Sequence, residues 1–216
     1  MFENYGYLIP NSQELERKSI GEKLHEDVAP ILYLSLMDLN SLLEFKEFKF
    51  GSQLQFTINN ISIAINKIRD ISHLIHPAAI ESFGFFHGLN DFGSILNSSQ
   101  GCKLEIENKI EGLTLDSFKQ LMLFRVVQEI AINSIVHGKA RSINLIMSKV
   151  DNKLNILINH NGNKFSKEDY IRGLLSNESI GLKNIQHRIG LLQGEISFEA
   201  VENSNMQNII INIPLN

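Results

Sequence analysis

Cysteine is nearly absent from this chain. Its one cysteine, Cys102, has no partner for an internal disulfide, which excludes disulfide-built secreted domains and favours a reducing compartment. Long apolar runs are also missing, because Arg125 and Glu129 interrupt the best candidate for the roughly 20 uncharged residues of a membrane span. The first ten residues lack the basic start and apolar run of a signal peptide. We expect a soluble, cytoplasmic protein that relies on a separate sensor protein, or on a region outside this chain, for any sensing.

The chain also lacks an excess of positive charge. Its net charge is −4 and no long basic run occurs, which argues against nucleic acid or an anionic membrane surface as a partner. Apolar residues are plentiful: 43% of the 216 residues are hydrophobic, which is enough for a real core. The residue pattern divides the chain into a tail at 1–11, a helical segment at 12–84 and a mixed segment at 85–216.

The helical segment is predicted to form an antiparallel hairpin. Residues 12–48 are rich in Glu, Lys and Leu, and Gly51 ends this long helix. From Ser52 onward, apolar residues recur at alternating steps of four and three, a repeat that is typical of helices packed against other helices. Because one hairpin leaves most of its apolar seam in water, we expect two copies to form a homodimeric four-helix bundle.

The first of these helices contains His25, which is followed by Glu26, Asp27 and Pro30. Proline has no amide to donate and its ring clashes inside a helix, so the helix is predicted to bend just after His25. A single histidine of this kind is most often a solvated side chain. The functional alternative is a nucleophile: a largely neutral imidazole at pH 7 can attack phosphorus while Glu26 or Asp27 takes the ring proton.

Residues 85–216 alternate between strand and helix patterns. They predict an α/β sandwich with an antiparallel-rich sheet covered by helices on one face, so the fold class of the whole chain is α+β. The polar, glycine-containing stretch 160–182 has the length, about 20 residues, of a functional lid or a disordered loop. The expected strands are 102–110, 142–147, 154–159, 196–201 and 206–214, and the expected helices are 121–140 and 181–192.

Three polar residues interrupt the nearly all-apolar helix 121–140. Glu129, Asn133 and His137 are spaced by four and therefore form one row on one helix face. One interpretation is that the row is the exposed edge of an amphipathic helix. The other is that a carboxylate and a carboxamide face a cavity and hold a hydrated cation with its polyphosphate.

These motifs, taken in chain order, resemble those of the sensor histidine kinases of two-component systems, which carry a GHKL (Bergerat) ATPase domain. Residues 128–140 are similar to the N box, 158–162 to the first glycine box and 180–194 to the second. The sequence EKLHEDVAP at 22–30 resembles the phosphoacceptor motif of the subclass whose partners are response regulators with helix-turn-helix output domains, and 71–85 resembles the end of that family's second dimerisation helix. The resemblance covers the chain from about Glu14 to its end.

The resemblance implies ATP and Mg²⁺ as cofactors and a role for each residue of the N box. Asn133 would coordinate Mg²⁺ that bridges the nucleotide phosphates. Glu129 would hold a metal-bound water or contact the groups that ligate the metal rather than the metal itself. His137 would lie near the phosphates.

The glycine boxes would complete the nucleotide site. Gly162 would let the backbone approach adenine, and the amides of Gly181 and Leu182 would bind the phosphates. His160 stands where the family usually has an aspartate that accepts from the adenine amino group. A neutral imidazole accepting that bond would weaken it by about 1–2 kcal/mol.

The resemblance also implies the reaction. His25 would accept the γ-phosphoryl group, with Glu26 as base, and pass it to an aspartate on a response regulator receiver domain. The alternative function is a histidine phosphotransfer protein whose degenerate GHKL domain no longer binds ATP, and a purely structural helical adaptor is a third.

Three further departures from the family pattern bear on these expectations. Lys164 and Ser179 replace glycines of the two glycine boxes, which stiffens the backbone there. Pro30 stands where the subclass often has a glutamine that orients water for dephosphorylation, so we expect phosphatase activity to be weak or absent.

Overall fold

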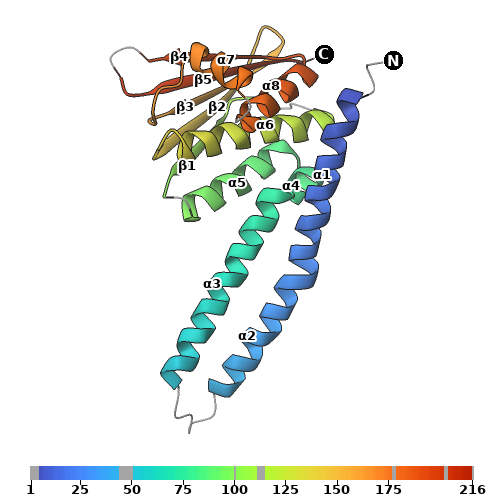
Figure 1. Cartoon of the computed structure of the whole chain (residues 1–216), viewed down its shortest axis with the longest axis vertical. Helices are drawn as coiled ribbons and strands as arrows, with labels where there is room; N and C mark the ends of the chain where they lie inside the picture. Colours follow the sequence, from blue (N-terminus) through green and yellow to red (C-terminus); the bar gives the residue numbers. More distant parts are fainter. Residues whose placement is uncertain are drawn as a thin grey trace. The chain divides into compact units, whose positions relative to one another are not determined.

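The chain forms two compact units, Met1–Ala78 and Ala79–Asn216, in the computed structural model (Figure 1). The structure describes residues 5–43, 51–99, 101–110, 115–176, 179–201 and 204–215. The first unit ends earlier than the domain limit expected at residue 84. Ile80, in α4 (Ala78–Phe83), packs so closely on Gly88 of α5 (Phe85–Ser99) that a side chain at Gly88 would overlap it. Because of this contact, α4 after Ala78 belongs with α5 to the second unit.

The first unit consists of helices that double back on themselves. The first stretch is α1 (Tyr5–Lys23), a π-helical turn η1 (Leu24–Val28) and α2 (Ala29–Leu43), and α3 (Gly51–Ile75) returns beside it (Figure 1). The tail expected at 1–11 is therefore helical from Tyr5, and the helix continues through Pro10. Residues 44–48 of the expected first helix lie outside the described residues. None of the helices in the described ranges is both long enough and apolar enough to span a membrane.

The hairpin is held by the apolar repeat of α3. Leu54, Ile58, Ile65 and Ser72 are its buried residues, and the Ser72 hydroxyl donates to the Gly21 carbonyl of α1 over 2.8 Å. An added Cβ at Gly21 would lie 2.7 Å from the Cβ of His76, so only glycine permits this approach. Many other large apolar side chains of the unit stay exposed, among them Ile31, Leu34, Met37, Phe56 and Ile63.

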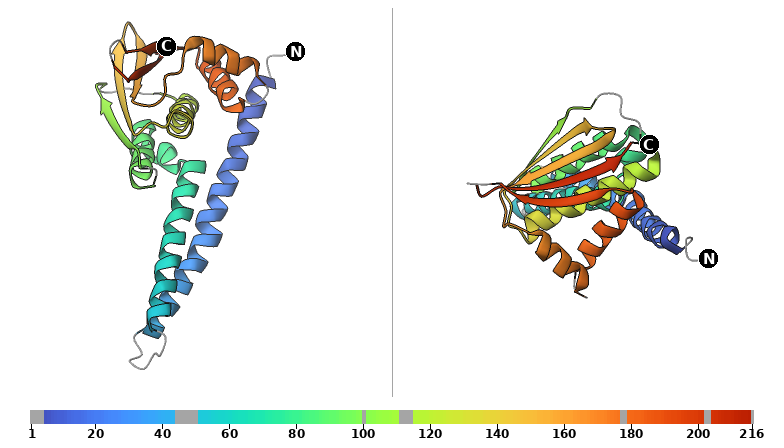
Figure 2. Two further views of the ribbon diagram at one scale, coloured as in Figure 1. Left: turned by 60° about the vertical axis from the view of Figure 1, so that its left-hand side comes forward. Right: turned by 90° about the horizontal axis from the view of Figure 1, so that it is seen from above.

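The second unit is a five-stranded mixed sheet with its helices on one face (Figure 2). The strands are β1 (Lys103–Asn108), β2 (Ser142–Val150), β3 (Lys153–His160), β4 (Glu195–Ala200) and β5 (Gln207–Pro214), in the order β1-β2-β3-β5-β4. β1 and β2 are parallel and the other neighbours antiparallel. The predicted α+β class and the antiparallel-rich sheet are confirmed in this unit.

Buried and less buried side chains alternate along the strands, which explains why one face of the sheet packs against the helices. Leu154, Ile156 and Ile158 of β3 and Ile209 and Ile211 of β5 all face the helices and are buried. The β2–β3 turn, Asp151-Asn152, has positive φ at both residues, as a two-residue hairpin turn of the primed type requires.

Three helices were not predicted from the sequence: α4, α5 and α7 (Lys167–Leu175). The last lies inside the stretch that was expected to be a loop. Ser166 and Asp169 form a reciprocal capping box at its N-terminus. The Ser166 side chain accepts from the Asp169 amide, and the Asp169 side chain accepts from the Ser166 amide. The remaining helices are α6 (Ser117–Val136) and α8 (Ile180–Leu191).

Candidate functional site

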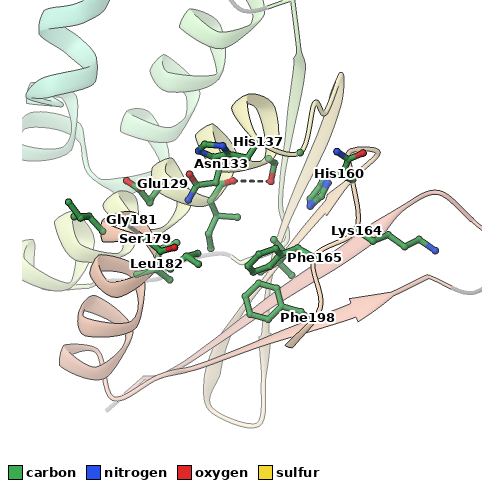
Figure 3. A pocket seen from close by; sticks show the side chains of 17 residues that line it. Glu129, Asn133, His137, His160, Lys164, Phe165, Ser179, Gly181, Leu182 and Phe198 are labelled. Carbon is green, nitrogen blue, oxygen red and sulfur yellow. Dashed lines mark hydrogen bonds between the residues drawn. The ribbon is translucent and has the colours of Figure 1, made fainter. Parts of the chain in front are cut away.

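The polar row of α6 faces a cavity with a volume of about 490 Å³. Glu129 and Asn133 are half-buried, His137 is the exposed C-cap residue, and all three line the cavity (Figure 3). From Leu121 to the end of α6, the other residues are apolar or buried, as the sequence indicated. Of the two interpretations of the row, the structure therefore supports the one in which it faces a cavity.

The start of α8 forms the wall opposite Glu129. Gly181 lies so close that an added Cβ would overlap the Glu129 carboxylate oxygen, so a side chain here would displace the carboxylate. The N-cap residue Ser179 bonds no α8 amide with its side chain; its hydroxyl lies 3.2 Å from that of Ser176 instead. The positive end of the α8 dipole, with the amides of Gly181 and Leu182, thus borders the cavity.

The other end of the cavity is aromatic and apolar. We call His160, Phe165, Phe198 and Ile209 the base end; all four line the cavity. The rings of Phe165 and Phe198 meet edge to face with centroids 5.5 Å apart. Figure 3 shows His160 and Phe165 on the side of the cavity away from Glu129 and Gly181. The lining thus has a polar end and an apolar end, as an amphiphilic ligand requires.

His160 is buried, with 2% of its surface exposed, and its Nδ1 accepts a hydrogen bond of 3.2 Å from the Gly162 amide. Burial lowers its pKa, which favours the neutral ring. A neutral imidazole with Nδ1 as acceptor carries its proton on Nε2. In this geometry the nitrogen that remains is a donor, in contrast to the expectation that His160 accepts a bond from the ligand.

Gly162 does not line the cavity, in contrast to the expectation that its backbone meets the ligand. A Cβ at this position would lie 2.7 Å from the Gly138 carbonyl oxygen and 3.1 Å from the Cβ of Ala140. Glycine is needed here because the chain after β3 packs against the chain that follows α6. Its contribution to the site is indirect, through the amide that orients His160.

Sequence reasoning missed Gln207, which fixes the base end. It is 2% exposed, faces His160 across the β3–β5 pair, accepts from the Phe165 amide over 2.5 Å and donates to the Phe165 carbonyl. A glutamine at the start of a strand gives no sequence signal for this role, because its partner lies 42 positions away.

The stability of the second unit should depend on pH through His160. An unfolded histidine has a pKa of about 6.5, and burial lowers that of His160 in the folded chain. Between the two pKa values the unfolded chain binds more protons, so the free energy of unfolding should fall as the pH drops below about 6.5. Urea unfolding at a series of pH values should show this slope, and His160→Gln should reduce it. An unchanged slope in the variant would contradict the assignment.

The predicted phosphoacceptor pair belongs to the first unit. His25 and Glu26 are both exposed and lie in the π-helical turn η1, where the Ala29 amide donates to the Leu24 carbonyl. The irregularity predicted from Pro30 is thus a π turn that includes His25 rather than a bend after it. Such turns are frequent at functional sites and widen the helix locally.

The charges at the polar end bear on the expected Mg²⁺. Among the described lining residues, Lys164 is the only lysine or arginine, whereas Glu129 adds a negative charge beside the α8 amides. A polyphosphate at these amides would be repelled by that carboxylate unless a cation lay between them. One carboxylate with one carboxamide suits Mg²⁺, which commonly takes one or two protein oxygens together with waters and substrate phosphates. The residues therefore fit the metal, which Glu129 and Asn133 would bind directly or through its waters.

The chain has a curated relative in sequence. The chain is 21% identical over 215 residues to the signal transduction histidine-protein kinase/phosphatase DegS of Brevibacillus brevis, an alignment that covers 98% of this chain and 54% of that protein. It thus spans about half the length of this curated relative. No protein-family model matches the chain.

Two solved structures share the fold. The histidine kinase domain of the blue-light activated histidine kinase from Erythrobacter litoralis EL346 is similar with a TM-score of 0.54 at 14% identity, over 88% of this chain and 94% of that one. Full-length ShkA in complex with AMPPNP is similar with a TM-score of 0.50 at 13% identity, over 88% of this chain and 45% of that one. Together with the sequence relative, they agree with the resemblance of the motifs: the chain is similar in sequence to a histidine kinase and shares the fold of histidine kinase domains.

Proposed function

We propose that the protein is an ATP-dependent protein histidine kinase that phosphorylates itself on His25 and passes the phosphoryl group to an aspartate of a response regulator. The observation that carries the proposal is the cavity between α6 and α8, where Glu129 and Asn133 meet the free end of a helix. A carboxylate, a carboxamide and helix amides together suit a magnesium polyphosphate.

Each part of the cavity has a task in this proposal. The amides of Gly181 and Leu182 bind the phosphates, and Gly181 keeps the space in which the Glu129 carboxylate lies. Phe165, Phe198 and Ile209 exclude water around the base. Mg²⁺, when bound, neutralises charge on the phosphates and makes the terminal phosphorus more electrophilic.

The transfer itself needs a neutral, accessible imidazole. A ring nitrogen of His25 attacks the γ-phosphorus, the bond from that phosphorus to the bridging oxygen breaks, and ADP leaves. The proton on the other ring nitrogen goes to the neighbouring Glu26 carboxylate. Exposure of both residues on η1 leaves them open to a nucleotide domain and later to a receiver domain.

A homodimer is part of the proposal. Ile31, Leu34, Met37 and Ile63 are exposed on the hairpin, at 53–64% of their surface, which is too much apolar area for a lone helical pair. A second copy of the hairpin would cover these residues in a four-helix bundle. Sedimentation of the full chain tests this part.

The competing function is a phosphotransfer protein with a nucleotide domain that does not bind nucleotide. The retained Glu129 and Asn133, both facing the cavity, favour the kinase. The test is incubation of the full chain with Mg²⁺ and either ATP or GTP labelled at the γ-phosphate. We expect an acid-labile, alkali-stable label that requires Mg²⁺. Absence of label with both nucleotides would contradict the kinase and leave the phosphotransfer function or the structural adaptor.

A further inference from the structure

The hydrogen bonding of His160 has a consequence for which base the site accepts. The argument rests on the proposed function, because it takes the ligand of the cavity to be a purine nucleoside triphosphate. Within the described chain, His160 supplies the only titratable side chain of the base end, and its buried position fixes which edge of the ring meets the ligand.

Two hydrogen-bond roles are divided between the ring nitrogens of His160. Nδ1 accepts from the Gly162 amide, so Nε2 bears the proton of the neutral ring. Gly162 is closely packed, because the Gly138 carbonyl and Ala140 leave no room for a side chain at that position. The tautomer is therefore set by the fold before any ligand arrives.

Nε2 is open to the cavity. In the part of the chain that the structure describes, every fully buried side-chain nitrogen and oxygen has a hydrogen-bond partner. Nε2 has no partner there, so it is not one of the fully buried atoms. His160 lines the cavity, so Nε2–H is a donor presented to whatever binds.

The part of a purine that reaches this donor follows from the polarity of the cavity. Gly181 and Leu182 bind the triphosphate at one end, and His160 lies at the other (Figure 3). In a purine nucleotide, the substituent on carbon 6 is at the end of the base farthest from the ribose. In adenine this substituent is an amino group, a donor that would oppose Nε2–H. In hypoxanthine and guanine it is a carbonyl oxygen, an acceptor that would pair with it.

We propose that the base end selects a purine with an acceptor at position 6, so that the protein binds a 6-oxopurine triphosphate more tightly than ATP. A site built around one fixed donor discriminates strongly against a ligand that brings a second donor, because two buried donors are then left without acceptors. We expect a preference of about tenfold.

Inosine triphosphate is the matched probe, because its base differs from adenine only at position 6 and in the proton on the adjacent ring nitrogen. Dissociation constants of the full chain for Mg²⁺ complexes of ATP and inosine triphosphate should favour the latter. His160→Asp replaces the donor with an acceptor and should reverse the order in favour of ATP. His160→Asn offers either a donor or an acceptor, so it should bring the two constants within about threefold of each other.

The outcomes separate the two proposals. Tighter binding of ATP than of inosine triphosphate by the wild-type chain would overturn the base preference and leave the kinase proposal standing. No binding of either nucleotide would overturn the proposed function, and the base preference with it. If His160→Asp fails to fold, the wild-type ratio and the His160→Asn variant still decide. A ¹⁵N spectrum of the free protein should also show His160 protonated on Nε2, and protonation on Nδ1 would contradict the proposal.

Discussion

Replacing His25 with glutamine should abolish the acid-labile label that the chain acquires from a γ-labelled nucleotide. Glutamine keeps the length and polarity of the side chain but has no nitrogen that can attack phosphorus. Because His25 is exposed in η1, the variant should fold normally. The loss should exceed 100-fold, since no other nucleophile is expected at that position.

His73→Gln is the matched control for this experiment. His73 is likewise an exposed histidine of the first unit, in α3, and its replacement should leave labelling unchanged. Nucleotide affinity should be the same in both variants, because the described residues that line the cavity all belong to the second unit. A label that survives in His25→Gln would refute the assignment of the phosphoacceptor.

Asn133→Ala should weaken the binding of a magnesium nucleotide by about 10- to 100-fold, the usual range for losing a group that ligates or orients a metal. Asn133 is half-buried on α6 and faces the cavity, so its side chain can be removed without opening the apolar core. The affinity measured in EDTA should change much less, because the interaction that is lost requires the metal.

Asn144→Ala controls for general effects of removing a carboxamide from this unit. Asn144 lies on β2, and its strand neighbour Ile143 is buried, so its own side chain points to the opposite face of the sheet. It should bind nucleotide as the wild type does. Equal losses with and without Mg²⁺ in Asn133→Ala would show that Asn133 acts on the nucleotide or the fold and not on the metal.

The sequence predicted the parts of the site that lie on one regular element. Glu129, Asn133 and His137 share a helix face because they are four positions apart, and such spacing can be read without any tertiary information. The strands also followed from alternation, and the turn at Asp151-Asn152 from its residue types.

What the sequence could not predict depends on contacts between distant segments. The role of Gln207 requires its pairing with Phe165, and the tautomer of His160 requires the Gly162 amide to fold back on the ring. The helix α7 was missed for a different reason. Its capping box, Ser166 to Asp169, stands in the sequence, but the polar composition of the whole stretch favoured a loop.

The most direct test of the account is calorimetric titration of the full chain with a non-hydrolysable magnesium nucleoside triphosphate. We expect one nucleotide per chain, an affinity that falls at least tenfold when EDTA removes the metal, and loss of binding in Gly181→Val, whose side chain would fill the space of the Glu129 carboxylate. Absence of saturable binding with both adenine and 6-oxopurine nucleotides, or an affinity that is indifferent to Mg²⁺ and to Gly181→Val, would contradict the claim that this cavity holds a magnesium nucleotide.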